Sequence, residues 1–243
     1  MAEMMFYERV VALSDQTHAG LKVRPAASFA YAAATNSVPL VASESFECAR
    51  EYPIVFARGE SGLLPAVLLG LRENENLFVD AAGKWDARYI PAFVRRYPFV
   101  PANGQGGDLL VCIDEASPCF SSTEGEALFA DGKPTPQLDH AIKFLREFHQ
   151  AAAATEVLGR RLDELGLLRP ADSLAKLNDG TEYRLNGLNV VDEGKLRALN
   201  KKAIQELFAN GSLGVIYAHL ISLGNLSGLV DRLSRRGKDG TPA

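Results

Sequence analysis

The two halves of this 243-residue chain carry different patterns of apolar residues, and that contrast constrains the fold most. In the first half, the apolar runs 53–57 and 66–71 are separated by the turn residues 58–62 (RGESG). Residues 109–113 (LLVCI) form another apolar run after a glycine-rich stretch. Short apolar runs bounded by turn residues predict strands, so we expect the first two runs to form a buried hairpin.

The second half shows helical spacing instead. Leu138, Ile142 and Leu145 recur at intervals of three or four residues, which predicts a helix over residues 136–150 with one apolar stripe. A second helix is expected over residues 152–165, where the chain remains rich in alanine and leucine. The tail is expected to form further helices at residues 192–198, 201–210, 213–223 and 226–235.

Shorter elements complete the predicted fold. We expect strands at residues 7–13, 21–23 and 77–80, a short helix at 43–50 with Ser43 as its N-cap, and a hairpin of residues 174–177 and 183–185 around the NDG turn 178–180. Together these elements predict an α+β fold, with a mostly antiparallel sheet in the first half and a helical C-terminal half packed on it. We treat residues 1–243 as one domain, in which residues 135–236 can form a helical subdomain.

Composition describes an ordinary globular protein. The chain is 47% hydrophobic and 23% charged, with a mean hydropathy of −0.04, which is not the composition of a disordered protein. Its net charge is −4 and its isoelectric point is about 5.7. Because general nucleic-acid binding needs a basic field, we expect no nucleic-acid partner.

Cysteine usage and the N-terminus bear on the compartment. Cys48, Cys112 and Cys119 are odd in number and lack the spacing of a zinc or redox motif, which favours a reducing compartment. The first residues, MAEMMFYER, carry acidic side chains where a signal peptide needs a basic flank and an apolar core. No uninterrupted apolar run reaches about 18 residues, so no integral membrane segment is expected. We therefore expect a cytoplasmic protein; the alternative is a cell-surface location reached without a signal peptide.

Motifs for catalysis and metal binding are missing from the sequence. There is no G-x-S-x-G and no H-E-x-x-H. His140 and His149 lie nine residues apart, about 180° around a helix, so they cannot share one site on a straight helix. The glycine-rich stretch 103–108 lacks a G-K-[ST] ending and precedes a strand, which indicates a surface loop instead of a phosphate site. We expect neither a metal nor a cofactor, and the sequence identifies no catalytic residue.

Residues 76–99 gather aromatic, arginine and proline residues more densely than the rest of the chain. Trp, Tyr and Arg are the residues that dominate recognition surfaces, so this segment supplies six candidate ligand-binding residues: Trp85, Arg88, Tyr89, Arg95, Arg96 and Tyr97. A structural interpretation competes with this one. Trp85, Tyr89 and Phe93 have the four-residue spacing of a helical stripe that faces the core, beside arginines that pair with local acids.

His219 is the seventh candidate ligand-binding residue. It lies on the apolar stripe of the helix expected at residues 213–223. A buried neutral imidazole needs a partner for each ring nitrogen, and the neighbouring residues 217–222 or another part of the chain would supply them. His219 is therefore either a ligand-binding residue or a core histidine with both nitrogens satisfied.

An ordered series of segments resembles the bacterial SapC family of surface-layer-associated proteins. The segments are YPIVF (52–56), PAVLLGL (65–71), residues 85–99, GEALF (125–129), LNVVDEGKL (188–196) and IYAHLISL (216–223). The resemblance spans residues 6–236 and excludes the membrane permease that shares the family's name. It implies no catalytic residue and no cofactor.

The resemblance links the chain with surface layers and, in other settings, with genes for flavin halogenases and outer-membrane receptors. We therefore expect a non-catalytic binding or accessory protein that recognises a peptide, a glycan or a partner protein, with a role at a surface layer or in outer-membrane uptake. The alternative is an enzyme, or the partner of an enzyme, that modifies a peptide or small molecule in a flavin halogenase system. Neither the oligomeric state nor the ligand follows from the sequence.

Overall fold

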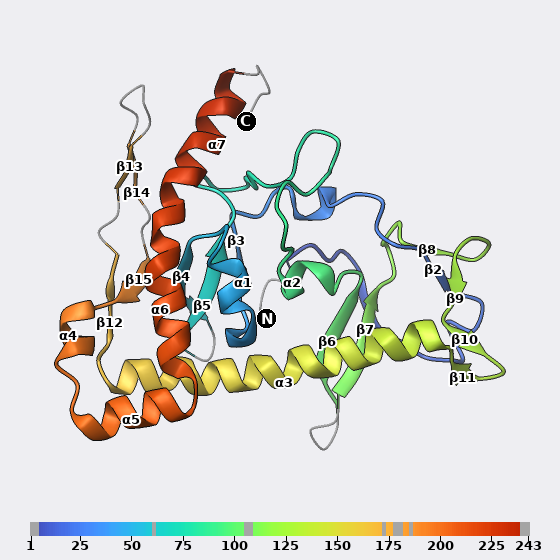
Figure 1. The fold of residues 1–243 in the computed structure, drawn as a ribbon. Helices are drawn as coiled ribbons and strands as arrows, with labels where there is room; N and C mark the ends of the chain where they lie inside the picture. Colours follow the sequence, from blue (N-terminus) through green and yellow to red (C-terminus); the bar gives the residue numbers. More distant parts are fainter. Residues whose placement is uncertain are drawn as a thin grey trace.

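The fold combines two main antiparallel sheets with one long helix that crosses both of them (Figure 1). It is seen in a computed structural model that describes residues 5–59, 62–104, 109–171, 174–176, 182–184 and 187–238. Strands lie mainly in the first half and helices in the C-terminal half, so the predicted α+β class is confirmed.

The larger sheet has five strands in the order β12-β15-β4-β5-β3. Their bounds are β3 (Ser37–Pro39), β4 (Ile54–Gly59), β5 (Gly62–Leu68), β12 (Leu168–Pro170) and β15 (Leu188–Val191). Strands β4 and β5 form the expected hairpin, in which Ile54 pairs with Val67 and Gly59 with Gly62. Ile54 and Val67 are buried on one face of the hairpin and Val55 and Ala66 on the other, so the prediction of a buried hairpin is confirmed.

The expected strand at residues 77–80 is not formed. The side chain of Asn76 donates a hydrogen bond to the Ala32 carbonyl (3.0 Å) and accepts one from the Phe78 amide (2.9 Å), which curls the chain locally. Val79 makes only an isolated bridge, to Trp85. Strand β3 pairs with β5 at the edge of the sheet instead, with Val38 opposite Val67.

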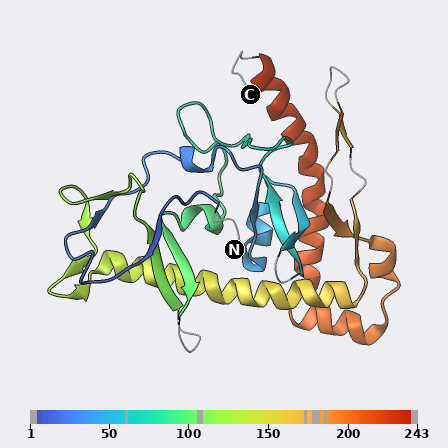
Figure 2. The same ribbon diagram turned by 180° about the vertical axis from the view of Figure 1, so that it is seen from behind.

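The second sheet has three strands in the order β1-β7-β6, namely β1 (Val10–Ala12), β6 (Phe99–Asn103) and β7 (Leu109–Asp114). The prediction of a strand at residues 109–113 is confirmed. Small ribbons flank this sheet: β2 (Lys22–Val23) lies between β8 (Phe120–Ser121) and β9 (Glu126–Ala127), and β10 (Phe129–Ala130) pairs with β11 (Lys133–Pro134). Figure 2 shows both main sheets from behind, with the long helix beneath them.

The long helix α3 (Pro136–Glu164) is continuous, so the prediction of two helices here is wrong. Thr135 caps it by accepting a hydrogen bond from the Leu138 amide (3.4 Å), and the alanine run at residues 151–154 favours helix instead of interrupting it. Along its length the helix enters three apolar clusters. Leu138 and Leu145 belong to the first, Phe148 to the second, and Leu158 and Leu162 to the third.

The C-terminal helices follow the prediction closely: α4 (Glu193–Arg197), α5 (Lys201–Ala209), α6 (Ser212–Ser222) and α7 (Leu226–Lys238), with the 3-10 turn η4 (Leu223–Asn225) between the last two. Gly211 stands at the N-cap of α6 with a φ of +80°, a conformation that favours glycine. Asp192 and Asn200 cap α4 and α5 with their side chains.

The short helices of the first half are η1 (Ala30–Ala32), η2 (Ala42–Glu44), α1 (Ser45–Cys48) and α2 (Ala92–Arg95). The helix expected at residues 43–50 is therefore formed in part, but Ser43 does not cap it, because a 3-10 turn precedes α1 and Glu44 stands at the N-cap. Strands β13 (Leu174–Lys176) and β14 (Glu182–Arg184) pair as expected, while the NDG turn between them lies outside the described residues.

Within the described residues, the helical stretch Ser212–Arg236 is long and apolar enough to cross a membrane, by length and composition alone. Of the 18-residue part of this stretch that is apolar enough, 33% is buried inside the protein. Val215 and Ile216 of α6 pack in one core cluster with Phe56 of β4 and Val191 of β15, so part of this apolar character belongs to the core.

Candidate functional site

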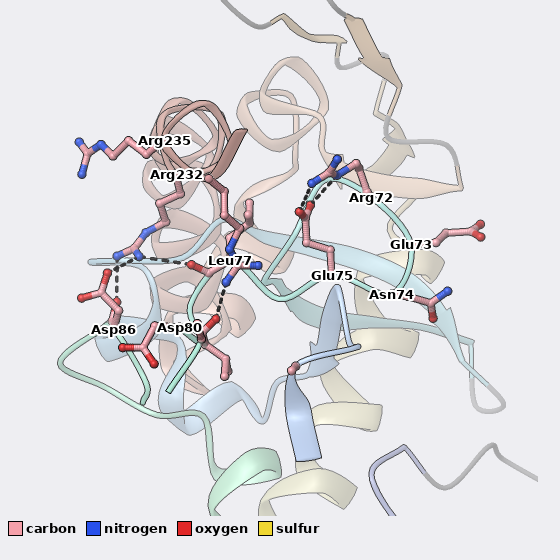
Figure 3. A pocket seen from close by; sticks show the side chains of 13 residues that line it. Arg72, Glu73, Asn74, Glu75, Leu77, Asp80, Asp86, Arg232 and Arg235 are labelled. Atoms are coloured by element: carbon pink, nitrogen blue, oxygen red, sulfur yellow. Dashed lines mark hydrogen bonds and ion pairs between the residues drawn. The ribbon is translucent and has the colours of Figure 1, made fainter. Parts of the chain in front are cut away.

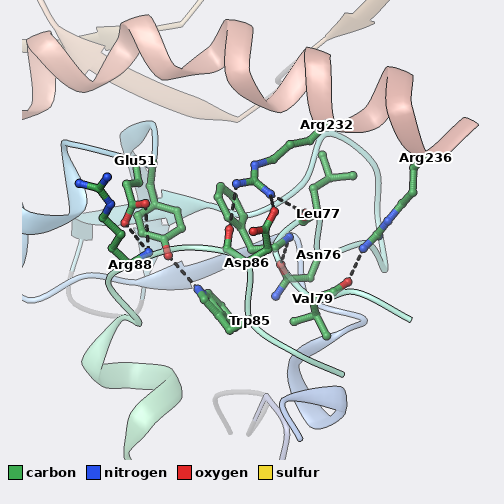
Figure 4. Close-up of polar contacts among 11 residues, drawn as sticks. Glu51, Asn76, Leu77, Val79, Trp85, Asp86, Arg88, Arg232 and Arg236 are labelled. Carbon is green, nitrogen blue, oxygen red and sulfur yellow. Dashed lines mark hydrogen bonds and ion pairs between the residues drawn. The ribbon is translucent and has the colours of Figure 1, made fainter. Parts of the chain in front are cut away.

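The residues around Trp85 form an irregular segment that is fastened to the core. Trp85 is 5% exposed, and its indole nitrogen donates a hydrogen bond to the Tyr52 hydroxyl (2.9 Å), as Figure 4 shows. Its ring packs against Phe29 and Phe78. The predicted helical stripe is wrong, because α2 begins only at Ala92. Trp85 is nevertheless a core residue, and its only polar group is already engaged.

Tyr89 and Arg95 converge on a buried carboxylate. Oε1 of Glu44 accepts hydrogen bonds from the Tyr89 hydroxyl (2.5 Å) and the Ala92 amide (2.7 Å), and the Arg95 guanidinium lies 3.5 Å away. Burial, followed by the hydrogen bond to Glu44, raises the pKa of Tyr89 well above its usual range. The guanidinium of Arg95 also stacks over the rings of Tyr89 and Phe144. Both candidate residues therefore have internal partners.

Arg96 points into the protein. Its guanidinium carbon lies 3.9 Å from the ring centroid of Phe93 and 5.1 Å from that of Phe148, and its Nε donates to the Tyr7 hydroxyl (3.1 Å). Burial lowers the pKa of Arg96 below its ordinary value. The aromatic rings of Tyr7, Phe93 and Phe148 thus enclose this side chain. The next residue, Tyr97, is also buried.

His219 is fully buried, and both of its ring nitrogens have partners. Nε2 accepts a hydrogen bond from the Val191 amide of β15 (3.1 Å), so Nδ1 carries the proton and donates to the Ile54 carbonyl of β4 (2.8 Å). Burial lowers the pKa of His219 to about 4. This is the core histidine of the structural interpretation, but its partners come from the sheet and not from residues 217–222.

Arg88 and Tyr89 line one pocket together. This pocket, which we call the Arg88 pocket, has a volume of about 380 Å³ and is lined by Glu47, Arg50, Glu51, Arg88 and Tyr89. The Glu51 carboxylate accepts hydrogen bonds from the backbone amides of Arg88 (2.9 Å) and Tyr89 (3.0 Å), which fixes this wall (Figure 4). Glu47 pairs with Arg50 at 3.3 Å. The exposed guanidinium of Arg88 has no partner among the described residues.

A larger pocket lies between α7 and the loop 72–86, with a volume of about 580 Å³ (Figure 3). We call it the α7 pocket. Arg232 donates to the Asp86 carboxylate (2.6 Å) and stacks over the Phe78 ring (4.3 Å). Arg236 donates to the Val79 carbonyl, and Arg72 pairs with Glu75. Arg232 and Arg236 thus fasten α7 to the loop, whereas the Arg72–Glu75 pair lies within the loop.

The structure therefore brings Arg88 and Tyr89 to one pocket and places the other five candidates outside it: Trp85, Arg95, Arg96, Tyr97 and His219. Sequence reasoning missed Glu44 and Glu51, the two carboxylates that position the segment. Both lie within or just after the short helix expected at residues 43–50, but nothing in the sequence indicates that they reach a segment some forty residues away.

Groups suited to nucleophilic or metal chemistry are not assembled in the described part of the chain. It holds no group of three or more His, Cys, Asp or Glu residues that could hold a metal ion. Cys48, Cys112 and Cys119 are buried free thiols, and burial raises the pKa of Cys48 and Cys112. Because the thiolate is the reactive form, these two thiols are poor nucleophiles.

Two antiparallel sheets joined by one long helix, with a small charged surface pocket beside the segment around Trp85, define the chain as an α+β protein. The sequence model of the SapC family matches residues 13–229 of the 243. The chain therefore belongs to the SapC family, as the resemblance predicted. No curated protein and no solved structure matches it.

Proposed function

We propose that this chain is a non-catalytic binding protein that recognises acidic peptide segments through the Arg88 pocket. The observation that carries the proposal is the state of the Arg88 guanidinium, which is exposed at the pocket and has no partner among the described residues. Arg95 and Arg96, in contrast, are held by Glu44 and by aromatic rings. A guanidinium fork binds a carboxylate through two parallel hydrogen bonds, so the pocket favours a carboxylate ligand.

A peptide fits the pocket better than a neutral glycan. Recognition of a sugar by an aromatic residue needs an open ring face. Tyr89 is half-buried, the Arg95 guanidinium lies 5.4 Å from its ring centroid, and its hydroxyl is used by Glu44. Beside the Glu47–Arg50 pair, the pocket presents the guanidinium of Arg88, which has no partner among the described residues. Acidic side chains and free C-termini of peptides carry the complementary group.

Binding is also favoured over catalysis by the partners of the remaining polar side chains. Both nitrogens of His219 are hydrogen-bonded to the backbone, so this imidazole is not available as a base. Glu51 holds two backbone amides at the wall of the pocket. Glu47 and Arg50 pair with each other, so Arg88 is the charged side chain of the lining that has no partner among the described residues.

The test uses short fluorescent peptides that carry either glutamate or glutamine at the same positions. We expect the glutamate peptide to bind more tightly, to weaken as salt is added, and to lose about tenfold in affinity with Arg88→Ala. Arg88→Lys should recover part of the loss, because it keeps the charge without the planar fork.

Arg235→Ala is the matched control, because Arg235 is an exposed arginine that lines the α7 pocket instead. Equal binding by wild type and Arg88→Ala would overturn the proposal. If Arg235→Ala weakened binding and Arg88→Ala did not, the ligand would belong to the α7 pocket.

A further inference from the structure

An apolar surface lies on α1 and α6, next to the Arg88 pocket. Phe46 is 62% exposed, Tyr217 52% and Ile221 72%. The Phe46 ring lies directly on the backbone of α6, since a Cβ placed at Gly214 would come within 2.9 Å of its Cζ. Tyr217 and Ile221 follow Gly214 by three and seven residues, so they share its face of the helix. We call Phe46, Tyr217 and Ile221 the apolar face.

Other side chains of α6 make its contacts with the core. Next to Ile221, Ser222 is fully buried and Leu220 packs against the core. The exposed parts of the three side chains amount to roughly 350 Å² of apolar surface, which is within the range of the largest such patches on monomers, and these are often functional. Such a patch lies beside a pocket whose Arg88 has no partner among the described residues, and together they have the composition of a recognition surface.

The segment 46–52 connects the apolar face with the Arg88 pocket. Glu47, which lines the pocket, follows Phe46 directly in α1, and Arg50 lies four residues after Phe46. The side chain of Asn225, at the end of η4, donates to the carbonyls of Ala49 (2.8 Å) and Tyr52 (3.1 Å). These bonds hold the turn that follows α6 against the segment 46–52.

We propose that a segment of a partner protein docks across both surfaces, with an apolar side chain on the apolar face and a carboxylate on Arg88. This inference rests on the proposed function and names the partner class for the same pocket. The carboxylate follows from charge complementarity with Arg88, the group at the pocket that has no partner among the described residues. A second copy of the chain is a poorer occupant, because a stable dimer buries about 800 Å² on each partner.

The test measures binding of short fluorescent peptides in which a leucine and a glutamate are separated by none to four residues, at fixed ionic strength. The panel includes the same peptides with serine for leucine and with glutamine for glutamate. At the best spacing, we expect each replacement to weaken binding about tenfold. Ile221→Ser should remove the preference for leucine and keep the preference for glutamate, and Arg88→Ala should do the reverse.

Leu110→Ser is the matched control, because Leu110 is a partly exposed apolar residue on β7, in the other sheet. It should leave all affinities unchanged. Circular dichroism and urea unfolding verify that every variant is folded.

The possible failures are distinguishable. If Arg88→Ala removes the preference for glutamate while leucine and serine peptides bind equally well, the docking inference is overturned and the proposed function stands. If Arg88→Ala changes nothing, the proposed function fails. If no peptide binds at millimolar concentration, both are overturned.

Discussion

The indole nitrogen of Trp85 donates a hydrogen bond to the Tyr52 hydroxyl, 2.9 Å away, and this hydroxyl donates in turn to the Tyr89 carbonyl. One buried tyrosine thus holds both ends of the segment 85–89. The segment has no regular hydrogen-bonded structure of its own beyond the bridge at Trp85, so these side-chain bonds decide its path. Arg88 lies between Trp85 and Tyr89, so the bonds of Tyr52 to these two residues determine its position.

Tyr52→Phe should destabilise the protein by about 1–3 kcal/mol, because the change leaves the Trp85 N–H without its buried acceptor and the Tyr89 carbonyl without its donor. Trp85→Ala should cost more, about 3–5 kcal/mol, since it also empties the space of the ring. Urea unfolding measures both changes. Tyr217→Phe is the control, because that hydroxyl is on a half-exposed side chain. A Tyr52→Phe variant as stable as wild type would contradict this account.

Arg96→Ala should lower the free energy of unfolding by about 2 kcal/mol or more, because the guanidinium is desolvated among the rings of Phe93, Phe148 and Tyr7. Arg88→Ala should change it by less than about 0.5 kcal/mol, since its side chain is exposed. Arg96→Lys should recover only part of the loss. Thermal and urea unfolding compare the three variants, and equal stability of the two alanine variants would refute the assignment.

His219 should make stability depend on pH in a defined window. Above pH 6.5 the imidazole is neutral in both states, and its full contribution to stability is present. As the pH falls from 6.5 toward about 4, the unfolded chain binds a proton that the folded protein does not, so stability is lost. The loss should reach roughly 3 kcal/mol.

The measurement is urea unfolding of wild type and His219→Gln at pH 7, 6, 5 and 4.5. Glutamine can keep both backbone hydrogen bonds but does not titrate, so the variant should lose less stability on acidification. Parallel pH profiles for the two proteins would show that another group is responsible.

Arg232→Ala should loosen α7 from the loop 72–86, because this side chain bonds Asp86 and stacks on Phe78. We expect faster amide hydrogen exchange over residues 226–236 and a loss of about 1 kcal/mol of stability. Arg235→Ala, three residues along the same helix, removes a side chain for which no bond is seen within the described chain. It should leave exchange unchanged. Similar exchange in both variants would rule out the fastening role of Arg232.

The sequence predicted those helices and strands that are determined by residues close together in the chain. The hairpin β4–β5 follows from two apolar runs and a turn, and the C-terminal helices follow from spacing and from Gly211. The strand expected at residues 77–80 is not formed, because this segment buries its apolar side chains as an irregular loop. The side chain of Asn76 bends the chain at a place where hydrophobicity alone predicts extension.

The candidate site was harder to predict because its geometry depends on contacts between distant residues. Composition drew attention to the segment around Trp85, but it could not separate Arg96, which lies among aromatic rings, from Arg88, which faces the pocket. That difference is set by Glu44 and Glu51, which bind the segment from elsewhere in the chain. Tyr217 and Ile221 lie four residues apart in the sequence. This spacing and their apolar character are equally compatible with burial, so the sequence does not predict that they are exposed.

The continuous helix α3 has a consequence for how this family can change in length. Leu138, Phe148 and Leu162 belong to three different apolar clusters, so their angular positions around one rigid axis must all be kept. A single inserted residue would turn everything beyond it by about 100° and carry Leu162 away from its cluster. Natural variation in the length of this helix should therefore come in near-whole numbers of turns, of about seven or eleven residues, whereas surface loops can change by any number.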